Sequence, residues 1–242
     1  MAFGMPPFPG PSHSGQAGDR LAHFLRGRSY EIPCRPNDFC AAAGIAGTLS
    51  AVPLASAEDV AKVETIALIR HGEKPATGLG QLDCQGLNRA LALPAVIRKA
   101  FGQPAAIFAP NPAEQKADLG TMYDYVRPLA TVEPAAIVFG LPIHADIGQS
   151  RIDDLRQQLD LPIYHDAVVL VGWEHRELVP LAQALLQEHG GDPKLVPKWN
   201  DGDFDSIYLL KIRRSGTATT ASFEVSHEGL NGQPTSCPGG AG

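Results

Sequence analysis

Two short apolar runs, far apart in the chain, constrain this sequence more than any other feature. They cover residues 64–69 and 167–171, and both are nearly continuous and rich in β-branched side chains. Such runs are typical of strands that are buried on both faces, as in the parallel sheets of α/β proteins. Helical patterns lie between them, so the sequence predicts alternating strands and helices.

The rest of the chain completes this alternation. Asp83 is a candidate N-cap, and residues 110–124 contain Pro, Asn, Asp and Gly over a length that suggests a functional loop. We expect helices over residues 83–101, 127–139, 152–159 and 177–188, strands over 105–109 and 141–144, and a C-terminal hairpin of 206–212 with 221–225. The predicted fold is a three-layer α/β/α sandwich with a mostly parallel sheet.

The N-terminal region has a different composition from this alternating part. Residues 1–38 are rich in Pro and Gly and lack apolar periodicity, so we expect disorder there. An uncharged, Ala-rich run at 39–57 follows Arg26, Arg28 and Arg35. It ends in Ala55-Ser56-Ala57, a small-x-small tripeptide of the kind that signal peptidase cleaves. We therefore divide the chain into a leader, residues 1–57, and a domain, residues 58–242.

This leader sets the expected location. An export signal at 39–57 would make the mature protein periplasmic or secreted, with no membrane anchor after processing. The alternative interpretation is a low-complexity linker, which would leave the protein in the cytoplasm. Cleavage after Ala57 would retain Cys84 and Cys237, which could pair in an oxidising compartment or stay reduced in the cytosol.

The charge balance excludes one class of partner. The chain has 26 acidic and 20 basic residues, a formal net charge of -6, whereas nucleic-acid binders normally carry a basic surplus. We therefore expect no nucleic-acid partner.

Two histidines directly follow the two strongest strands. Arg70-His71-Gly72-Glu73 comes after the first strand, and Glu174-His175 comes after residues 167–171. Ligands of parallel α/β sheets bind outside the carboxyl ends of the strands, so both histidines should reach one crevice. An imidazole can form a covalent intermediate, and guanidinium groups match phosphate oxygens. The arrangement suits phosphoryl chemistry.

These motifs resemble those of the histidine phosphatase superfamily, which has a phosphoglycerate mutase-like fold. The resemblance covers about residues 63–190. It rests on Arg70-His71-Gly72, on a helix start like Leu82-Asp83-Cys84-Gln85-Gly86, on Arg127-x-x-x-Thr131, and on the histidine at the end of Val171-Gly172-Trp173-Glu174-His175.

The resemblance implies a role for each of these positions. His71 would be the nucleophile, and Arg70, Arg127 and His175 would bind the phosphoryl group. We favour Glu174 as the general acid, with Glu73 and Asp146 as alternatives. Arg176 stands where the acid-phosphatase branch has Asp, which argues against that branch.

The predicted function is a phosphatase that hydrolyses a phosphomonoester, on a small molecule or a phosphoprotein, through a phosphohistidine on His71. A phosphoglycerate mutase-like phosphotransferase and a non-catalytic phosphate-binding module are the alternatives. The sequence offers no carboxylate cluster for a metal, so we expect neither metal nor cofactor.

Overall fold

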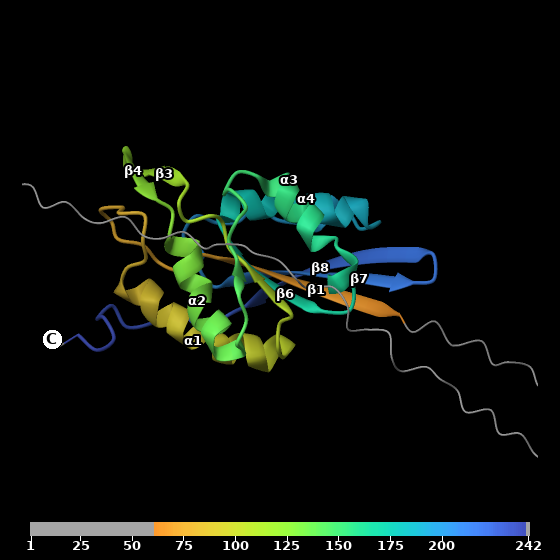
Figure 1. Ribbon diagram of the computed structural model, residues 1–242, viewed down its shortest axis with the longest axis horizontal. Coiled ribbons are helices and arrows are strands. Elements are labelled where there is room, and N and C mark those ends of the chain that lie inside the picture. The colour runs from red at the N-terminus through yellow and green to blue at the C-terminus, as the bar shows by residue number, and fades with distance from the viewer. Residues whose placement is uncertain (1–60, 241–242) are drawn as a thin grey trace, which may run out of the picture. The chain divides into compact units, whose positions relative to one another are not determined.

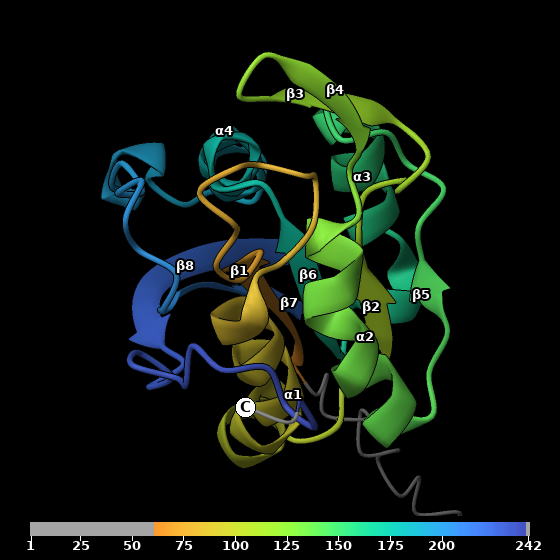
Figure 2. The ribbon, with the colours of Figure 1, turned by 90° about the vertical axis from the view of Figure 1, so that its left-hand side faces the viewer.

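The computed structural model describes residues 61–240, so the predicted leader, residues 1–57, lies outside the described residues. The described chain forms a six-stranded sheet in the order β5-β2-β6-β1-β7-β8 and a separate hairpin, β3-β4. Figure 2 shows this hairpin above the helices α1 and α2. None of the helices within residues 61–240 combines the length and hydropathy that crossing a bilayer requires.

The central sheet is mostly parallel. β1 pairs with β6, β6 with β2, and β2 with β5, all in parallel, whereas β7 is antiparallel to both β1 and β8. The sheet strands are β1 (Lys62–Arg70), β2 (Ala106–Phe108), β5 (Ile143–His144), β6 (Val168–Trp173), β7 (Ser206–Ser215) and β8 (Ala218–His227). This topology confirms the predicted fold class.

Helices cover both faces of the sheet, as Figure 1 shows. Side chains on β1 alternate between two cores: Ile66 and Leu68 pack with α3 and α4, whereas Ala67 and Ile69 pack with α1 and α2. This two-sided burial is the reason for the continuous apolar run in β1. The helices are α1 (Cys84–Phe101), α2 (Arg127–Phe139), α3 (Ile152–Leu159) and α4 (His175–Glu188), with short 3₁₀ turns η1 (Pro162–Tyr164) and η2 (Pro193–Leu195).

Residues 110–124 differ from the prediction of a loop. They contain the hairpin of β3 (Gln115–Asp118) and β4 (Thr121–Asp124). Its two-residue turn, Leu119-Gly120, has positive φ at both positions (51° and 85°), as a type I′ turn requires. Asn-Gly usually marks such turns, and leucine there hides the hairpin from sequence analysis.

The start of α1 packs tightly against the segment that follows His71. Asp83 is the N-cap, and its side chain accepts a hydrogen bond from the Gly86 backbone nitrogen at 2.8 Å. A Cβ atom on Gly86 would lie 2.3 Å from the carbonyl oxygen of Glu73, so the close approach requires glycine. The helix start therefore positions the Gly72-Glu73 backbone.

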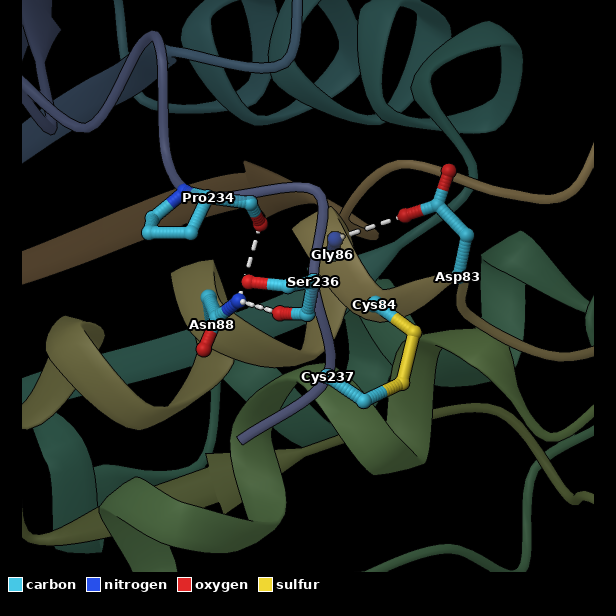
Figure 3. Close-up of a disulfide and its surroundings, with 7 residues drawn as sticks. All are labelled: Asp83, Cys84, Gly86, Asn88, Pro234, Ser236 and Cys237. Carbon is cyan, nitrogen blue, oxygen red and sulfur yellow. Dashed lines mark hydrogen bonds between the residues drawn. A yellow bond between two sulfur atoms is a disulfide. The ribbon is translucent and has the colours of Figure 1, made fainter. Parts of the chain in front are cut away.

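A disulfide joins the C-terminal tail to the same helix start (Figure 3). It links Cys84 with Cys237, one of the two outcomes that the sequence left open. The side-chain amide of Asn88 donates to the carbonyl oxygens of Pro234 and Ser236 at 2.8 and 2.9 Å. The C-terminal tail is thus held against the first turns of α1.

Candidate active site

The first site residues emerge side by side from adjacent strands. β1 and β6 are parallel neighbours with Arg70 opposite Trp173, so His71 and the Glu174-His175 pair leave the sheet at the same edge. The backbone nitrogen of His71 donates to the carbonyl oxygen of Trp173 at 3.1 Å. A cavity of about 330 Å³ lies there, and its wall includes all five predicted principal residues: Arg70, His71, Arg127, Glu174 and His175.

His71 is arranged as a neutral imidazole. It is 3% exposed, and its Nδ1 lies 2.8 Å from the carbonyl oxygen of Gly72. Because a carbonyl only accepts, Nδ1 carries the ring proton and Nε2 keeps a lone pair. Burial lowers the pKa of His71 to about 3, and the charges of Arg127 and Arg70 act in the same direction. The ring is therefore uncharged near neutral pH.

Arg70 is fixed by a backbone loop while part of its guanidinium stays available. Its Nη1 donates to the carbonyl oxygens of Asp201 and Asp203 at 2.6 and 3.1 Å. Its Cζ lies 4.0 Å from the ring centroid of Phe204. Its Nε is buried and finds no partner among residues 61–240. A buried donor without a partner costs about 1–3 kcal/mol unless a ligand accepts from it.

Arg127, the first residue of α2, repeats this pattern from another element. Its Nη1 pairs with Asp118 of β3, and the other oxygen of Asp118 lies 2.6 Å from the Lys74 Nζ. The Nε of Arg127 is also buried without a partner in the described chain. Two arginines from different elements thus line the cavity together with His71, and each has a buried donor without a partner in the described chain.

His175 lies between two carboxylates. Its Nε2 is 2.7 Å from Asp201 Oδ1, and its Nδ1 is 3.0 Å from Glu174 Oε1. Burial acts to raise the pKa of Glu174, but the contact with His175 and the nearby charge of Lys116 bring it below its usual value. Glu174 is therefore ionised near neutral pH in the unliganded protein.

The two alternative acids lie outside this cavity. Both oxygens of Glu73 accept hydrogen bonds from Arg89, at 2.7 and 2.9 Å. Asp146 is exposed, and neither residue lines the cavity. Position after a strand does not determine where a carboxylate points, and the role of general acid stays a prediction for all three residues. Among the predicted acids, only Glu174 lies in the cavity wall.

Sequence analysis missed several charged residues in the wall. Lys116 and Asp118 alternate along β3, which places them on one face of that strand, but the segment was expected to be a loop. Asp201 arrives from the segment before β7 and has no local signal. The residues missed are Lys74, Lys116, Asp118, Arg176 and Asp201.

The cavity as a whole favours an anion. Its wall holds five lysines or arginines against three carboxylates, a surplus of two positive charges with the histidines left out of the count. Helices α2 and α4 begin at Arg127 and His175 in this wall, and neither has a side-chain N-cap hydrogen bond. Their positive ends add to the field, as at many phosphate sites.

The structure is similar to several solved structures whose sequences are only distantly similar to this one. No family model and no curated protein matches the chain. It is similar to a phosphohistidine phosphatase SixA from Nakamurella multipartitia (14% identity, TM-score 0.46, 68% of this chain and 96% of that one). It is also similar to a phosphoglycerate mutase from Plasmodium falciparum (15%, 0.43, 67% and 89%) and to a mycobacterial glucosyl-3-phosphoglycerate phosphatase (14%, 0.43, 67% and 97%). With TM-scores below 0.5, the activity of this chain has to be argued from its own residues.

Proposed function

We propose that the protein is a phosphatase that hydrolyses a phosphomonoester through a covalent phosphohistidine on His71. One observation carries the proposal. The neutral His71 keeps a lone pair on Nε2 in the same cavity as two arginines, Arg70 and Arg127, each with a buried donor that lacks a partner in the described chain. A phosphoryl group would accept from both donors and present its phosphorus to the imidazole.

Binding uses the positive surplus of the cavity. A phosphomonoester dianion would neutralise the two excess charges in its wall. Its oxygens would accept from the guanidinium groups of Arg70 and Arg127, and His175 would complete the pocket once its Nε2 leaves Asp201. Donors already fixed by Asp118 and by backbone carbonyls need little reorganisation, which is the basis of electrostatic preorganisation.

The first chemical step transfers the phosphoryl group. The Nε2 lone pair of His71 forms a bond to phosphorus while the ester P–O bond breaks. The ring proton stays on Nδ1, hydrogen-bonded to the Gly72 carbonyl oxygen. The leaving oxygen needs a proton, which Glu174 supplies in our scheme. Glu174 is ionised in the unliganded protein, but a dianion bound beside it raises its pKa, since like charges disfavour ionisation.

The second step returns the enzyme to its starting state. Ionised Glu174 takes a proton from a water molecule, whose oxygen bonds to phosphorus as the P–N bond breaks. Glu174 then carries this proton, and His71 is again neutral. When inorganic phosphate leaves, Glu174 releases the proton to water, which restores the ionised Glu174 of the unliganded protein. One carboxylate thus serves as acid and then as base.

Replacement of the nucleophile tests the proposal. For the full chain, we expect phosphate release from a panel of phosphomonoesters, with His71→Ala lowering kcat by about a thousandfold or more because no other group in the wall replaces it. A rapid quench with labelled substrate should give an acid-labile, alkali-stable label that His71→Ala lacks. His165→Ala, a histidine outside the cavity wall, is the matched control. Near wild-type turnover by His71→Ala would refute the mechanism.

We also propose that the protein acts outside the cytosol, after cleavage behind Ala57. The disulfide between Cys84 and Cys237 supports this, because such bonds persist in oxidising compartments. The N-terminal sequence of protein from a periplasmic or culture-supernatant fraction should begin at Glu58. Recovery of the intact chain from the cytosol alone would refute this location and leave the phosphatase proposal untouched.

A further inference from the structure

A second cavity lies directly beside the cavity that His71 lines, and the proposed mechanism does not use it. Its volume is about 310 Å³, at the small end of the range of roughly 300–1,000 Å³ for small-molecule sites. It shares three wall residues with the first cavity: His175, Arg176 and Asp201. A group attached to a phosphate held beside His175 could therefore extend into this space.

Asp201 forms the border between the two cavities. Its Oδ1 lies 2.7 Å from His175 Nε2 and 3.3 Å from Arg176 Nη2. The side chain is 68% exposed, so it can turn into water without burying its charge. When His175 transfers its Nε2 contact from Asp201 to a phosphate oxygen, this border opens.

The second cavity is lined by both apolar and charged side chains. Val179 and Pro180 of α4, with Trp199, supply the apolar surface. Trp199 itself is fixed, stacked on Tyr208 with ring centroids 4.0 Å apart and donating from Nε1 to the carbonyl oxygen of Asp203 at 3.1 Å. The same cavity is also lined by Arg176 and Lys198, which carry donors, and by Asp201, which carries acceptors. A ligand here would need C–H surface and hydroxyl groups together.

Charge narrows the class of ligand further. The phosphate dianion already balances the two surplus charges of the first cavity, and Arg176 is paired with Asp201. An alkyl chain would displace water from Arg176 and Asp201 and return no hydrogen bonds, which is costly for charged groups. A hydroxyl-rich ring satisfies donors and acceptors and lays its C–H face on the apolar side chains.

We propose that this second cavity, bounded by Asp201, Lys198 and Val179, is the leaving-group subsite and that it takes a sugar or polyol. This assignment rests on the proposed phosphatase function and names the substrate class for that same site: sugar or polyol phosphomonoesters.

A matched pair of substrates tests the subsite. Glucose 6-phosphate and cyclohexylmethyl phosphate both join a six-membered ring to phosphate through one methylene, and they differ chiefly in hydroxyl groups and the ring oxygen. For the full chain we expect kcat/KM to favour the sugar phosphate by about tenfold or more, the value of one hydrogen bond to a charged group. Lys198→Ala should lower kcat/KM about tenfold for glucose 6-phosphate and leave that for cyclohexylmethyl phosphate unchanged.

Filling the cavity gives a second, steric test. Val179→Trp should lower kcat/KM for glucose 6-phosphate about tenfold or more, yet leave the inhibition constant of inorganic phosphate unchanged, because that ion occupies only the first cavity. Val138→Trp, at an exposed position of α2, is the matched control and should behave as wild type. Lys198→Ala decides the question if Val179→Trp does not fold.

The outcomes separate this inference from the function on which it rests. Active enzyme without preference for the sugar phosphate, or equal losses on both esters in Lys198→Ala, overturns the subsite and leaves the phosphatase intact. A protein that hydrolyses no phosphomonoester overturns the proposed function and the subsite with it.

Discussion

Two buried arginines, Arg89 on α1 and Arg127 on α2, use their hydrogen-bond donors in opposite ways. Arg89 of α1 is 0% exposed and Arg127 of α2 is 4% exposed, so burial does not distinguish them. All three nitrogens of Arg89 have acceptors, whereas the Nε of Arg127 finds none within residues 61–240.

The Arg89 site is closed by carboxylates from three parts of the chain. Glu73 follows the nucleophile, and Asp205 and Glu228 lie beside β7 and β8; their oxygens are 2.7, 3.3 and 2.7 Å from Arg89 nitrogens. The Asn231 side chain accepts a further hydrogen bond at 3.3 Å. This cluster, Arg89 with Glu73, Asp205 and Glu228, has three carboxylates for one cation and leaves no donor for a ligand.

The cavity lined by His71 and Arg127 has the opposite balance, five cations against three carboxylates. In a structural arginine all donors are hydrogen-bonded to protein acceptors. In a binding arginine some donors have no partner until the ligand binds, which lowers the stability of the unliganded protein. The contrast explains why Glu73 belongs to the scaffold and Glu174 to the site. It also predicts that mutations in the two sites will damage different properties.

Removal of Arg89 should give the largest change in stability. Arg89→Met keeps much of the side-chain volume but leaves three carboxylates around a buried position without their cation, so we expect a loss of about 3–5 kcal/mol in the free energy of unfolding. Urea denaturation followed by circular dichroism measures it. Arg98→Met, which changes an exposed arginine of the same helix, is the control. A loss no larger than that of the control would contradict the scaffold role.

Removal of Arg127 should damage activity and spare the fold. Arg127→Met deletes a phosphate donor, and we expect kcat/KM for a phosphomonoester to fall by about 10²–10³. The free energy of unfolding should change by less than about 1 kcal/mol. Asp118 would still form its ion pair with Lys74, and the remaining cations of the cavity wall would still outnumber its carboxylates. Steady-state kinetics and urea denaturation on the same preparation separate the two effects. A large stability loss with unchanged kcat/KM would exchange the roles assigned to the two arginines.

The strands, the helix starts and the strand-end histidines can be predicted from the sequence because local patterns determine them. The apolar run of β1 predicts its two-sided burial, and Asp83 marks a helix start that the structure confirms. The convergence of His71 and His175 follows from strand order alone. These features need only periodicity and the rule that parallel strands share an edge.

The partners of the charged residues could not be predicted in the same way. Glu73 contacts Arg89 sixteen positions further along the chain, and Glu228 reaches Arg89 across 139 positions. Asp118 pairs with Arg127 from a hairpin whose turn residue Leu119 has a positive φ that leucine rarely adopts. Such contacts depend on tertiary packing. The sequence therefore predicts which reactive residues follow a strand, but it does not predict which carboxylates pair with the charged residues around them.

The smallest expected effect concerns the acidic surplus around Arg89 and its response to pH. Burial raises the pKa of Glu228 to about 8; Arg89 opposes this rise, while Asp205 and Glu73 add to it. The folded state therefore holds a proton on Glu228 that the unfolded chain, with a pKa near 4.5, has released. By linkage, this contribution to stability is complete below pH 4.5 and is lost as the pH rises to about 8.

Glu228→Gln keeps the shape and the neutral state, so it should remove this loss. We expect the variant to lose less stability than wild type between pH 6 and 9, with a gain on the order of 1 kcal/mol at the alkaline end, or about 2–4 °C in Tm. Thermal melts across that window measure the difference in slope. Glu224→Gln, at an exposed position of β8, should retain the wild-type slope. Glu228→Gln could instead destabilise the protein at every pH by as much as Arg89→Met. That result would show that Glu228 is ionised in its cluster with Arg89, and it would contradict the raised pKa.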